Sequence, residues 1–198
     1  MNHQQFLTVS DSAGTAIEGP VSYTDISVDK SFLVLRHRIE FRRDFKPGAS
    51  GILQTSGTIN VDECKILISD MKTTALFQAC ADKKVLSLQL RLFRSLGDMR
   101  KVAFTIEFTN TTIKQFQEGP WHSFQKTGEW DLPFVDESFF ETIPEEDKIL
   151  KPDTNVVALS LSPLGMITTT YNAASTTAEE HGTTANKIDL NKVQVAAS

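Results

Sequence analysis

The stretch "ISDMKTTALFQACADKKVLSLQLRLFRS", residues 68–95, joins two different periodicities without a break. In its first half, Met71, Ala75 and Ala79 follow an i, i+4, i+8 row with Leu76 and Cys80 beside them, which is typical of a helix. In its second half, leucines at 86, 88, 90 and 92 alternate with polar residues, which is typical of a strand with one buried face. We therefore predict a short helix over residues 70–83 that leads directly into a strand. Ser69 or Asp70 is its expected N-cap, and Lys83 and Lys84 lie near its negative C-terminal end.

The other long apolar segments alternate like strands. "VAFTIEFT" (102–109) follows the leucine strand after a Gly-Asp connector, which predicts an antiparallel hairpin. "FLVLRHRIEFR" (32–42) predicts a strand with one apolar and one charged face. Its apolar face carries Leu33, Leu35, His37, Ile39 and Phe41. "NVVALSLSPLGMITTTY" (155–171) predicts a late pair of strands broken near Pro163, which cannot donate to a ladder. One short helix among many two-faced strands favours a mainly β barrel or sandwich whose open end the helix covers.

Composition limits the function. The chain has 198 residues and a formal net charge of -5, so it offers no cationic excess for binding nucleic acid through phosphates. No apolar run approaches the roughly 20 residues of a membrane helix, and the N-terminus does not resemble a secretory signal peptide. Cys64 and Cys80 have neither metal-ligand nor redox spacing, so we expect reduced, buried thiols and folding in the cytoplasm.

Two regions depart from this pattern. Residues 117–155 hold both tryptophans, several phenylalanines and an acidic run, and we expect an ordered excursion that packs its aromatics on the barrel or on a neighbouring chain. Residues 172–198 are rich in Ala and Thr, and we expect a flexible C-terminal tail, mobile to about Asn186. Its last part, from Ile188 to Val195, has a pattern that could dock as an edge strand. The remaining chain, 1–171, is then a single domain.

The order of these pieces resembles the Hcp (haemolysin-coregulated protein) family, the tube subunits of type VI secretion systems. "FLTVSDSAGTAIEGPV" is similar to that family's first strand and turn, and "DKSFLVLRHRIEF" to its second strand. "GTINVDECKILISDMKTTALFQACADKKVLSLQLRLFRS" resembles its strand–helix–strand block, and "KVAFTIEFTNTTIKQFQ" the hairpin partner. "VVALSLSPLGMITTTY" resembles the closing strands, where the family's "I-x-W-x-Y" run has Thr169 or a neighbour in place of Trp. The Pro that the family carries at the helix entry is also missing.

The resemblance implies a mainly β, Hcp-like β-barrel of two antiparallel sheets with one flanking α-helix. It also implies hexameric rings that stack into a tube, inside a contractile sheath and under a VgrG-type spike, with effector proteins in the lumen or fused to the subunit. The expected partners are thus other copies of the chain, the spike, the sheath and effectors, with neither nucleic acid nor membrane insertion. Assembly would be cytoplasmic, followed by secretion or injection through the type VI system.

Five residues are the candidate contacts of such a subunit. Three arginines, Arg36, Arg38 and Arg42, form one face of a strand, with Arg43 beyond them; we call these four the basic stripe. The stripe is either a solvated strand face or a surface in the lumen or at the seam between subunits, where an acidic run such as "PEEDK" (144–148) could pair with it. The loop 42–57 resembles the extended loop by which family members contact a neighbour, and Phe45 is its candidate anchor.

Catalytic and cofactor sites are not expected. His37, His122 and His181 lack metal-binding spacing, and His37 reads as a core histidine with a hydrogen-bond partner. Neither thiol has a pattern typical of a nucleophile, and no Gly-rich loop precedes a helix. A structural, non-enzymatic tube subunit is therefore the main hypothesis. The alternatives are the tail-tube protein of a phage or another contractile particle, and a monomeric β-sandwich that binds a peptide or glycan.

Overall fold

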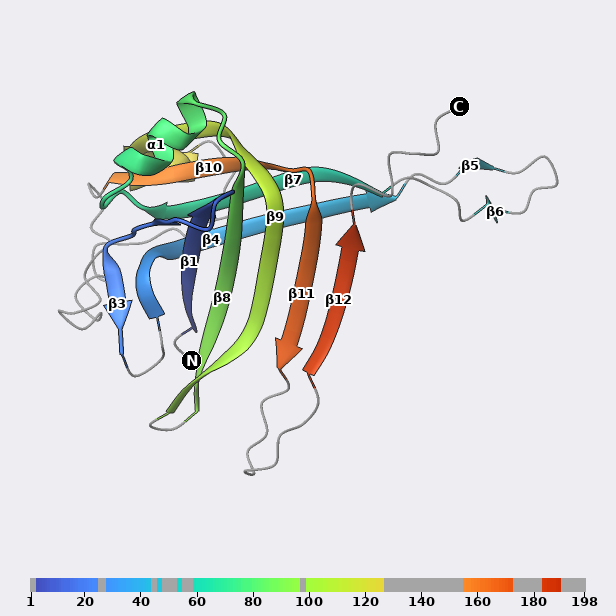
Figure 1. Cartoon of the computed structure of the whole chain (residues 1–198), viewed down its shortest axis with the longest axis horizontal. Coiled ribbons are helices and arrows are strands. Elements are labelled where there is room, and N and C mark those ends of the chain that lie inside the picture. The colour runs from blue at the N-terminus through green and yellow to red at the C-terminus, as the bar shows by residue number, and fades with distance from the viewer. Residues whose placement is uncertain are drawn as a thin grey trace.

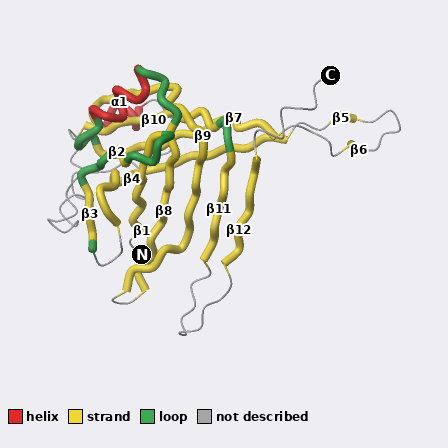
Figure 2. The backbone as a smooth tube through the Cα atoms, in the orientation of Figure 1, coloured by secondary structure: helices red, strands yellow, loops and turns green. Residues whose placement is uncertain are grey.

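The computed structural model describes residues 3–24, 28–43, 46–47, 53–54, 59–96, 99–126, 155–172 and 183–189. Figure 2 shows that strands dominate these residues and that helix is confined to short pieces. In chain order the elements are β1 (His3–Asp11), β2 (Ala16–Ile17), β3 (Val21–Tyr23), β4 (Val28–Arg43), β5 (Lys46–Pro47), β6 (Leu53–Gln54), β7 (Ile59–Ser69), α1 (Thr74–Ala81), β8 (Leu86–Leu96), β9 (Met99–Pro120), α2 (Trp121–Lys126), β10 (Asn155–Pro163), β11 (Met166–Asn172) and β12 (Thr183–Asp189).

Six strands close into a barrel. Hydrogen bonding follows the order β10-β7-β4-β1-β8-β9, and β10 pairs with β9 as well, so the ring of pairings is complete. In Figure 1, β4, β7 and β10 run across the molecule while β1, β8 and β9 run steeply, which makes two walls. β11 and β12 extend the steep wall beyond β9. The predicted mainly β, antiparallel fold with a flanking helix is confirmed, and the two expected sheets are walls of one continuous sheet.

The predicted hairpin is confirmed as β8 and β9. Leu88 stands opposite Phe108, and Leu90 opposite Ile106, so the alternating leucines meet the apolar residues of their partner strand. Phe93 follows Leu92 and lies on the outer side of the wall by ordinary alternation, where it packs with Phe6 and Val28. The register shift between Leu92 and Phe93 leaves Ala103 of β9 as the extra residue and places Val102 opposite Phe93. The alternation in the sequence therefore predicted the pairing correctly up to this bulge.

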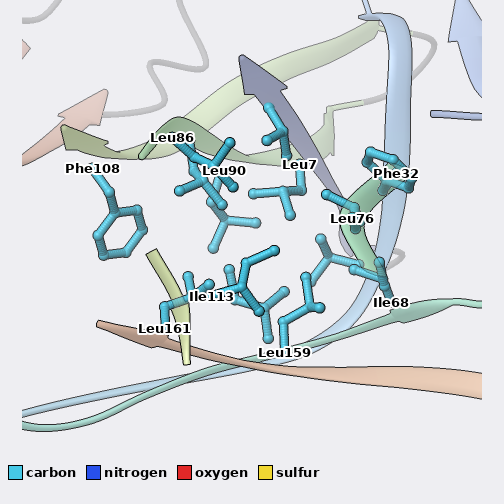
Figure 3. Close-up of a cluster of buried hydrophobic side chains, with 14 of the residues drawn as sticks. Leu7, Phe32, Ile68, Leu76, Leu86, Leu90, Phe108, Ile113, Leu159 and Leu161 are labelled. Atoms are coloured by element: carbon cyan, nitrogen blue, oxygen red, sulfur yellow. The ribbon is translucent and has the colours of Figure 1, made fainter. Parts of the chain in front are cut away.

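The main core fills the space between the two walls. Figure 3 shows side chains from both walls meeting Leu76 of α1. Each fully buried Leu, Ile or Phe contributes roughly 1.5–3 kcal/mol of hydrophobic stabilisation. The largest fully buried side chains of the described residues are Phe6, Phe32, Phe108, Leu7, Ile66, Leu67, Ile68, Leu76, Leu86, Leu90, Leu159 and Ile167.

The predicted helix is present but shorter, and its caps differ from the prediction. α1 begins after Thr73, whose hydroxyl donates to the carbonyl of Asp70 and does not cap the helix, so the expected N-cap at Ser69 or Asp70 was wrong. The buried face holds Leu76 and Ala79, whereas Met71 precedes the helix and is exposed. The large Leu76 therefore decides which side of the helix faces the core.

α1 ends in a Schellman motif. Lys84 N–H donates to the carbonyl of Ala79 at 2.9 Å, and Lys83 N–H donates to the carbonyl of Cys80 at 3.2 Å. Lys83 has a left-handed backbone with φ of 52°. These bonds satisfy carbonyls that the last helical turn would otherwise leave without partners. The role of Lys83 is thus conformational, in a position that usually holds glycine.

β4 contains a bulge that the sequence pattern did not reveal. The register between β4 and β7 shifts between Val34 and Arg36. Before the shift, Phe32 and Val34 face the main core; after it, Ile39 does. Leu33 and Leu35 therefore lie on the outer side, so the predicted shared face from Leu33 to Phe41 was wrong in its first half. The extra residue reverses the alternation because side chains change face at every position.

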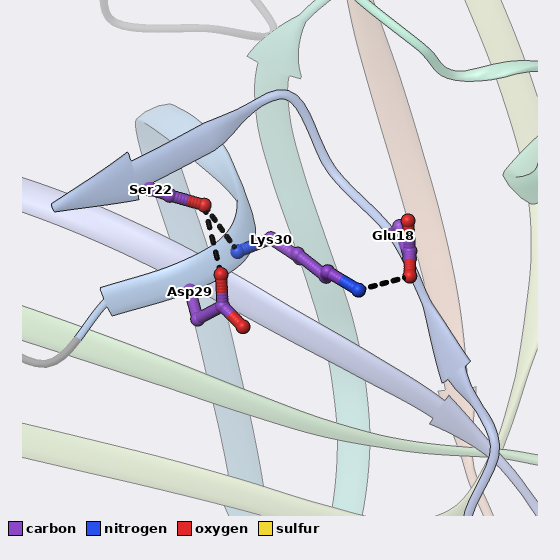
Figure 4. A network of polar contacts seen from close by, with 4 residues as sticks. All are labelled: Glu18, Ser22, Asp29 and Lys30. Atoms are coloured by element: carbon purple, nitrogen blue, oxygen red, sulfur yellow. Dashed lines mark hydrogen bonds and ion pairs between the residues drawn. The ribbon is translucent and has the colours of Figure 1, made fainter.

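Two smaller clusters cover parts of the outer surface. Under β3, Phe6 makes edge contacts with Phe93 and Tyr23, with ring centroids 5.7 and 5.6 Å apart. Figure 4 shows the polar contacts that hold this region: Ser22 Oγ donates to Asp29 at 2.9 Å, Lys30 N–H donates to Ser22 Oγ at 2.9 Å, and the Lys30 ammonium pairs with Glu18. Elsewhere α2, which the sequence did not predict, places Trp121 and Phe124 in a cluster with Leu67.

β9 bends where it leaves β8 and joins β10. Asn110 has a φ of 50°, and its carbonyl accepts a hydrogen bond from Leu164 N–H at 2.9 Å. Met166 N–H donates to the hydroxyl of Thr109 at 2.8 Å. Gly165 fits here because a Cβ at this position would lie 2.4 Å from the carbonyl oxygen of Thr109. The predicted break near Pro163 is therefore the turn that docks onto this bend.

Candidate interaction surfaces

The basic stripe begins on the outer face of β4. Arg36 and Arg38 are exposed, and Arg38 donates a hydrogen bond to Glu40 at 3.2 Å. Lys65 of β7 stands opposite Arg38 in the register, so a third cation lies on the same face. Exposed ion pairs contribute at most about 1 kcal/mol to folding. These charges are therefore available for contacts with other molecules at little cost to the barrel.

The other candidate contact residues are only partly within the described structure. Arg42 and Arg43 continue β4, where their backbones pair with Asn60 and Ile59, and their side chains lie outside the described residues. Phe45 lies outside the described residues altogether. Within the predicted loop 42–57, the structure describes the pairing of β5 with β6. The structure therefore places the four arginines along one strand but does not test the interface role of any of the five.

A cavity of about 420 Å³ opens between the walls, away from α1. We call it the Thr169 cavity, after the β11 residue that stands opposite Ile106 of β9. Its walls are mainly apolar, and Phe41 at its edge is 38% exposed. It is lined by His37, Arg38, Ile39, Phe41, Phe104, Ile106 and Thr169.

His37 lies at this cavity as a histidine with a hydrogen-bond partner, as the sequence predicted. Its Nδ1 lies 2.7 Å from Oε1 of Gln5 on β1. Burial, and to a lesser degree the positive charge of Arg36, hold the pKa of His37 below its ordinary value. The ring is thus favoured in its neutral form and serves to join β1 and β4.

A row of polar side chains crosses the steep wall on its outer side. The row consists of Thr8, Gln89, Glu107 and Thr168, which are register partners across β1, β8, β9 and β11. The amide of Gln89 donates to Glu107 at 2.7 Å. Three of the four line a groove of about 580 Å³. Sequence reasoning did not select this row, although Gln89 and Glu107 lay on the predicted polar faces of their strands.

The aromatics follow the prediction where the structure describes them, and the thiols follow it in part. Cys64 and Cys80 are both free; Cys64 is buried, and burial raises the pKa of its thiol to about 12, whereas Cys80 is only half-buried. Trp121 and Phe124 pack on the barrel, whereas Trp130 lies outside the described residues. Among the described residues, no group of three or more His, Cys, Asp or Glu side chains could hold a metal ion. Neither α1 nor α2, the helices of these ranges, has the length and hydrophobicity needed to cross a bilayer.

Comparison with solved structures gives close matches over almost the whole chain. A double mutant of the Hcp1 protein from E. coli EAEC 042 has a TM-score of 0.63 at 14% identity, covering 94% of this chain and 98% of that one. Hcp1 from Salmonella typhimurium has a TM-score of 0.61 at 15% identity, covering 97% of each chain. The chain has the Hcp fold. A type six secretion system protein matches equally well, with a TM-score of 0.65, 11% identity, and coverage of 96% of this chain and 98% of that one.

Sequence comparison adds nothing to this result, since no family model and no curated protein matches the chain. The likeness to Hcp therefore lies in the fold, at identities where few side chains are shared. The resemblance to Hcp led us to expect a tryptophan at the position of Thr169 or a neighbour, and Thr169 lines the cavity described above.

Proposed function

We propose that this protein is a structural subunit of a type VI secretion inner tube, which forms hexameric rings that stack. One observation supports the proposal above all others: the Hcp fold extends over 94% or more of both chains in each reported comparison. A binding module that shared only a β-sandwich architecture with Hcp would not need the helix, the long strands and the closing hairpin in this arrangement.

The surfaces of the barrel suit such a role. A tube subunit must present one surface to a water-filled lumen and others to its neighbours. The steep wall carries the polar row on its outer side, while β4 carries exposed Arg36 and Arg38. We place the basic stripe at the seam between subunits, where arginines pair well with carboxylates. Because a ring seam joins two different surfaces, the stripe would meet an acidic surface on the next copy.

In this proposal the protein works by assembly and passage of cargo rather than by catalysis. Its partners would be other copies, a VgrG-type spike, a sheath and effector proteins. It would assemble in the cytoplasm and leave the cell through the secretion system. The loop 42–57, with Phe45, would reach an adjacent subunit or ring.

The first experiment is the mass in solution, measured by light scattering after size exclusion at two protein concentrations. A species near six chains that persists on dilution would support the tube proposal, and negative-stain images should then show rings. A clean monomer at both concentrations would contradict it and favour a monomeric binding module. A tryptophan signal that changes when a peptide or glycan is added to the monomer would strengthen that alternative.

A further inference from the structure

The groove of about 580 Å³ along the polar row, which we call the polar groove, carries two carboxylates, Asp29 and Glu107. Glu107 is half-buried, and one of its oxygens accepts the hydrogen bond from the Gln89 amide at 2.7 Å. Asp29 is exposed and accepts a hydrogen bond from Ser22 Oγ at 2.9 Å. A carboxylate has about four acceptor positions, so both can bind further donors. The groove therefore suits a cationic group that donates hydrogen bonds.

Arg91 lines the same groove and restricts the choice of partner. Its guanidinium lies over the ring of Phe93, 5.8 Å from the centroid. In the register Gln89 stands opposite Glu107 and Arg91 opposite Thr105, so Arg91 is the diagonal neighbour of Glu107. Such neighbours are about 7–8 Å apart. A partner that carries a cation and an anion at about this spacing would match the groove better than a single cation.

The basic stripe has this pattern of charges beside it. Arg38 and Glu40 lie two residues apart on the outer face of β4, or about 7 Å. Their side chains are 54% and 52% exposed. Arg36 is exposed on the same face, and Lys65 stands opposite Arg38 on β7. When Arg38 faces Glu107, Glu40 can therefore face Arg91, and the other two cations are left for Asp29 and the rim of the groove.

The two charged surfaces cannot meet within one chain. The stripe lies on the outer side of the wall formed by β4, β7 and β10, and the polar groove on the outer side of the steep wall. The main core fills the space between these walls, so their outer sides point away from each other. Each surface is thus available to the complementary surface of another copy.

We propose that the basic stripe of one copy docks into the polar groove of the next copy in the ring, with Arg38 paired with Glu107 and Glu40 paired with Arg91. This inference rests on the proposed tube function and names the acidic surface that its seam needs. The contact joins two different surfaces, as a closed ring requires. An arginine can bind a carboxylate through two parallel hydrogen bonds, and charge pairs of both signs fix the register of the two surfaces.

The test exchanges the two charges of the central pair. Arg38→Glu and Glu107→Arg each place like charges across the seam, whereas the double variant restores an opposite pair. Glu118→Arg is the matched control, because Glu118 is exposed on β9 but does not line the groove. Combined with Arg38→Glu, it restores the net charge without the contact. Light scattering at several protein concentrations measures ring formation, and thermal unfolding checks that each variant is folded.

We expect each single reversal in the pair to raise the concentration for half-assembly of rings roughly fivefold or more, and the charge-swapped double variant to return within about twofold of the wild type. Arg38→Glu with Glu118→Arg should remain as impaired as Arg38→Glu alone. Glu107→Gln keeps a side chain that can bond to Gln89 and serves if Glu107→Arg does not fold. It should weaken rings in the same direction.

Three outcomes would overturn the inference while the wild type still forms rings and the tube proposal stands. The first is additive losses in the charge-swapped variant, and the second is unchanged assembly of Glu107→Gln. The third is rescue of Arg38→Glu by Glu145→Arg, which would make the acidic run 144–148 the partner of the stripe instead. A wild-type monomer would contradict the tube proposal itself, and the inference with it.

Discussion

At the scale of single residues, His37 predicts a pH dependence of stability. Its pKa lies below the ordinary value near 6.5, chiefly because the ring is buried. Below pH 6.5 the unfolded chain binds a proton at His37, whereas the folded chain binds it only at a lower pH. The stability that the neutral ring contributes is therefore fully present above pH 6.5 and is lost as the pH falls toward the folded pKa. His37→Gln removes the titration and can still bond to Gln5.

Urea unfolding between pH 7 and pH 5 checks this prediction. The free energy of unfolding of the wild type should fall more steeply over this range than that of the His37→Gln variant. Equal slopes would mean that His37 titrates alike in the folded and unfolded chains, against the direction that its burial implies.

Replacing Lys83 with glycine should stabilise the folded protein. Its φ of 52° costs an L-amino acid free energy that glycine does not lose, while both Schellman bonds come from the backbone and survive the substitution. Lys83→Gly should raise the free energy of unfolding by about 0.5–1 kcal/mol, measured by urea denaturation. Lys84→Gly is the control, and it should give no gain because Lys84 does not have a positive φ. A loss at Lys83 would show that its side chain matters more than its backbone.

Several single residues could be predicted from the sequence. His37 and Cys64 stood in apolar strand patterns, and both are buried or half-buried as expected. The helix cap could not be predicted in the same way. Ser69 and Asp70 are good caps by residue type, yet the chain forms a turn through Thr73 before α1 begins. The position of the cap depends on how Leu76 reaches the core, which is a tertiary effect.

At the scale of elements, alternation and helical spacing predicted the strands and α1 well, and failed at bulges. A bulge adds one residue to a strand and leaves no mark in composition when that residue is apolar, as Leu35 is. The same holds for α2: its Trp121 and Phe124 suggested packing on the barrel, but six residues are too few to show helical periodicity.

In the turn between β10 and β11, one added methyl group at Gly165 should strongly destabilise the protein. In Gly165→Ala, the new Cβ would lie 2.4 Å from Thr109 O and 2.8 Å from its hydroxyl, so the backbone of the turn or of β9 must move. We expect a loss of about 2–3 kcal/mol in the free energy of unfolding. Gly119→Ala is the matched control, since its nearest neighbour is the Ser123 hydroxyl at 3.3 Å, and it should lose far less. Similar losses in both variants would contradict this account of the turn.

At the scale of the whole molecule, the order of elements was sufficient to suggest the Hcp fold, and the structural matches confirm that likeness. The surfaces were harder to foresee. The Thr169 cavity forms from β4, β9 and β11, which are far apart in the sequence. The polar row likewise depends on the register of four strands. Such sites form only when several strands pair in a particular register, so the residue pattern along a single strand cannot predict them.

The basic stripe predicts how assembly should depend on charge and salt. If Arg36 and Arg38 lie at the seam between subunits, Arg36→Glu with Arg38→Glu should raise the concentration for half-assembly of rings by roughly tenfold or more, because like charges would then meet across it. Both residues are exposed, so the monomer should unfold at an unchanged temperature. Added salt should weaken wild-type rings in the same direction, since it screens these pairs. Light scattering at several salt concentrations measures both effects.

The matched control carries the same change in net charge elsewhere on the barrel. Lys101→Glu with Lys114→Glu alters two exposed lysines of β9 and should leave ring formation unchanged. Rings that form normally with both arginines reversed would contradict the seam position. The basic stripe would then lie either in the lumen, where its positive charge would face the cargo, or on a solvated face of the barrel.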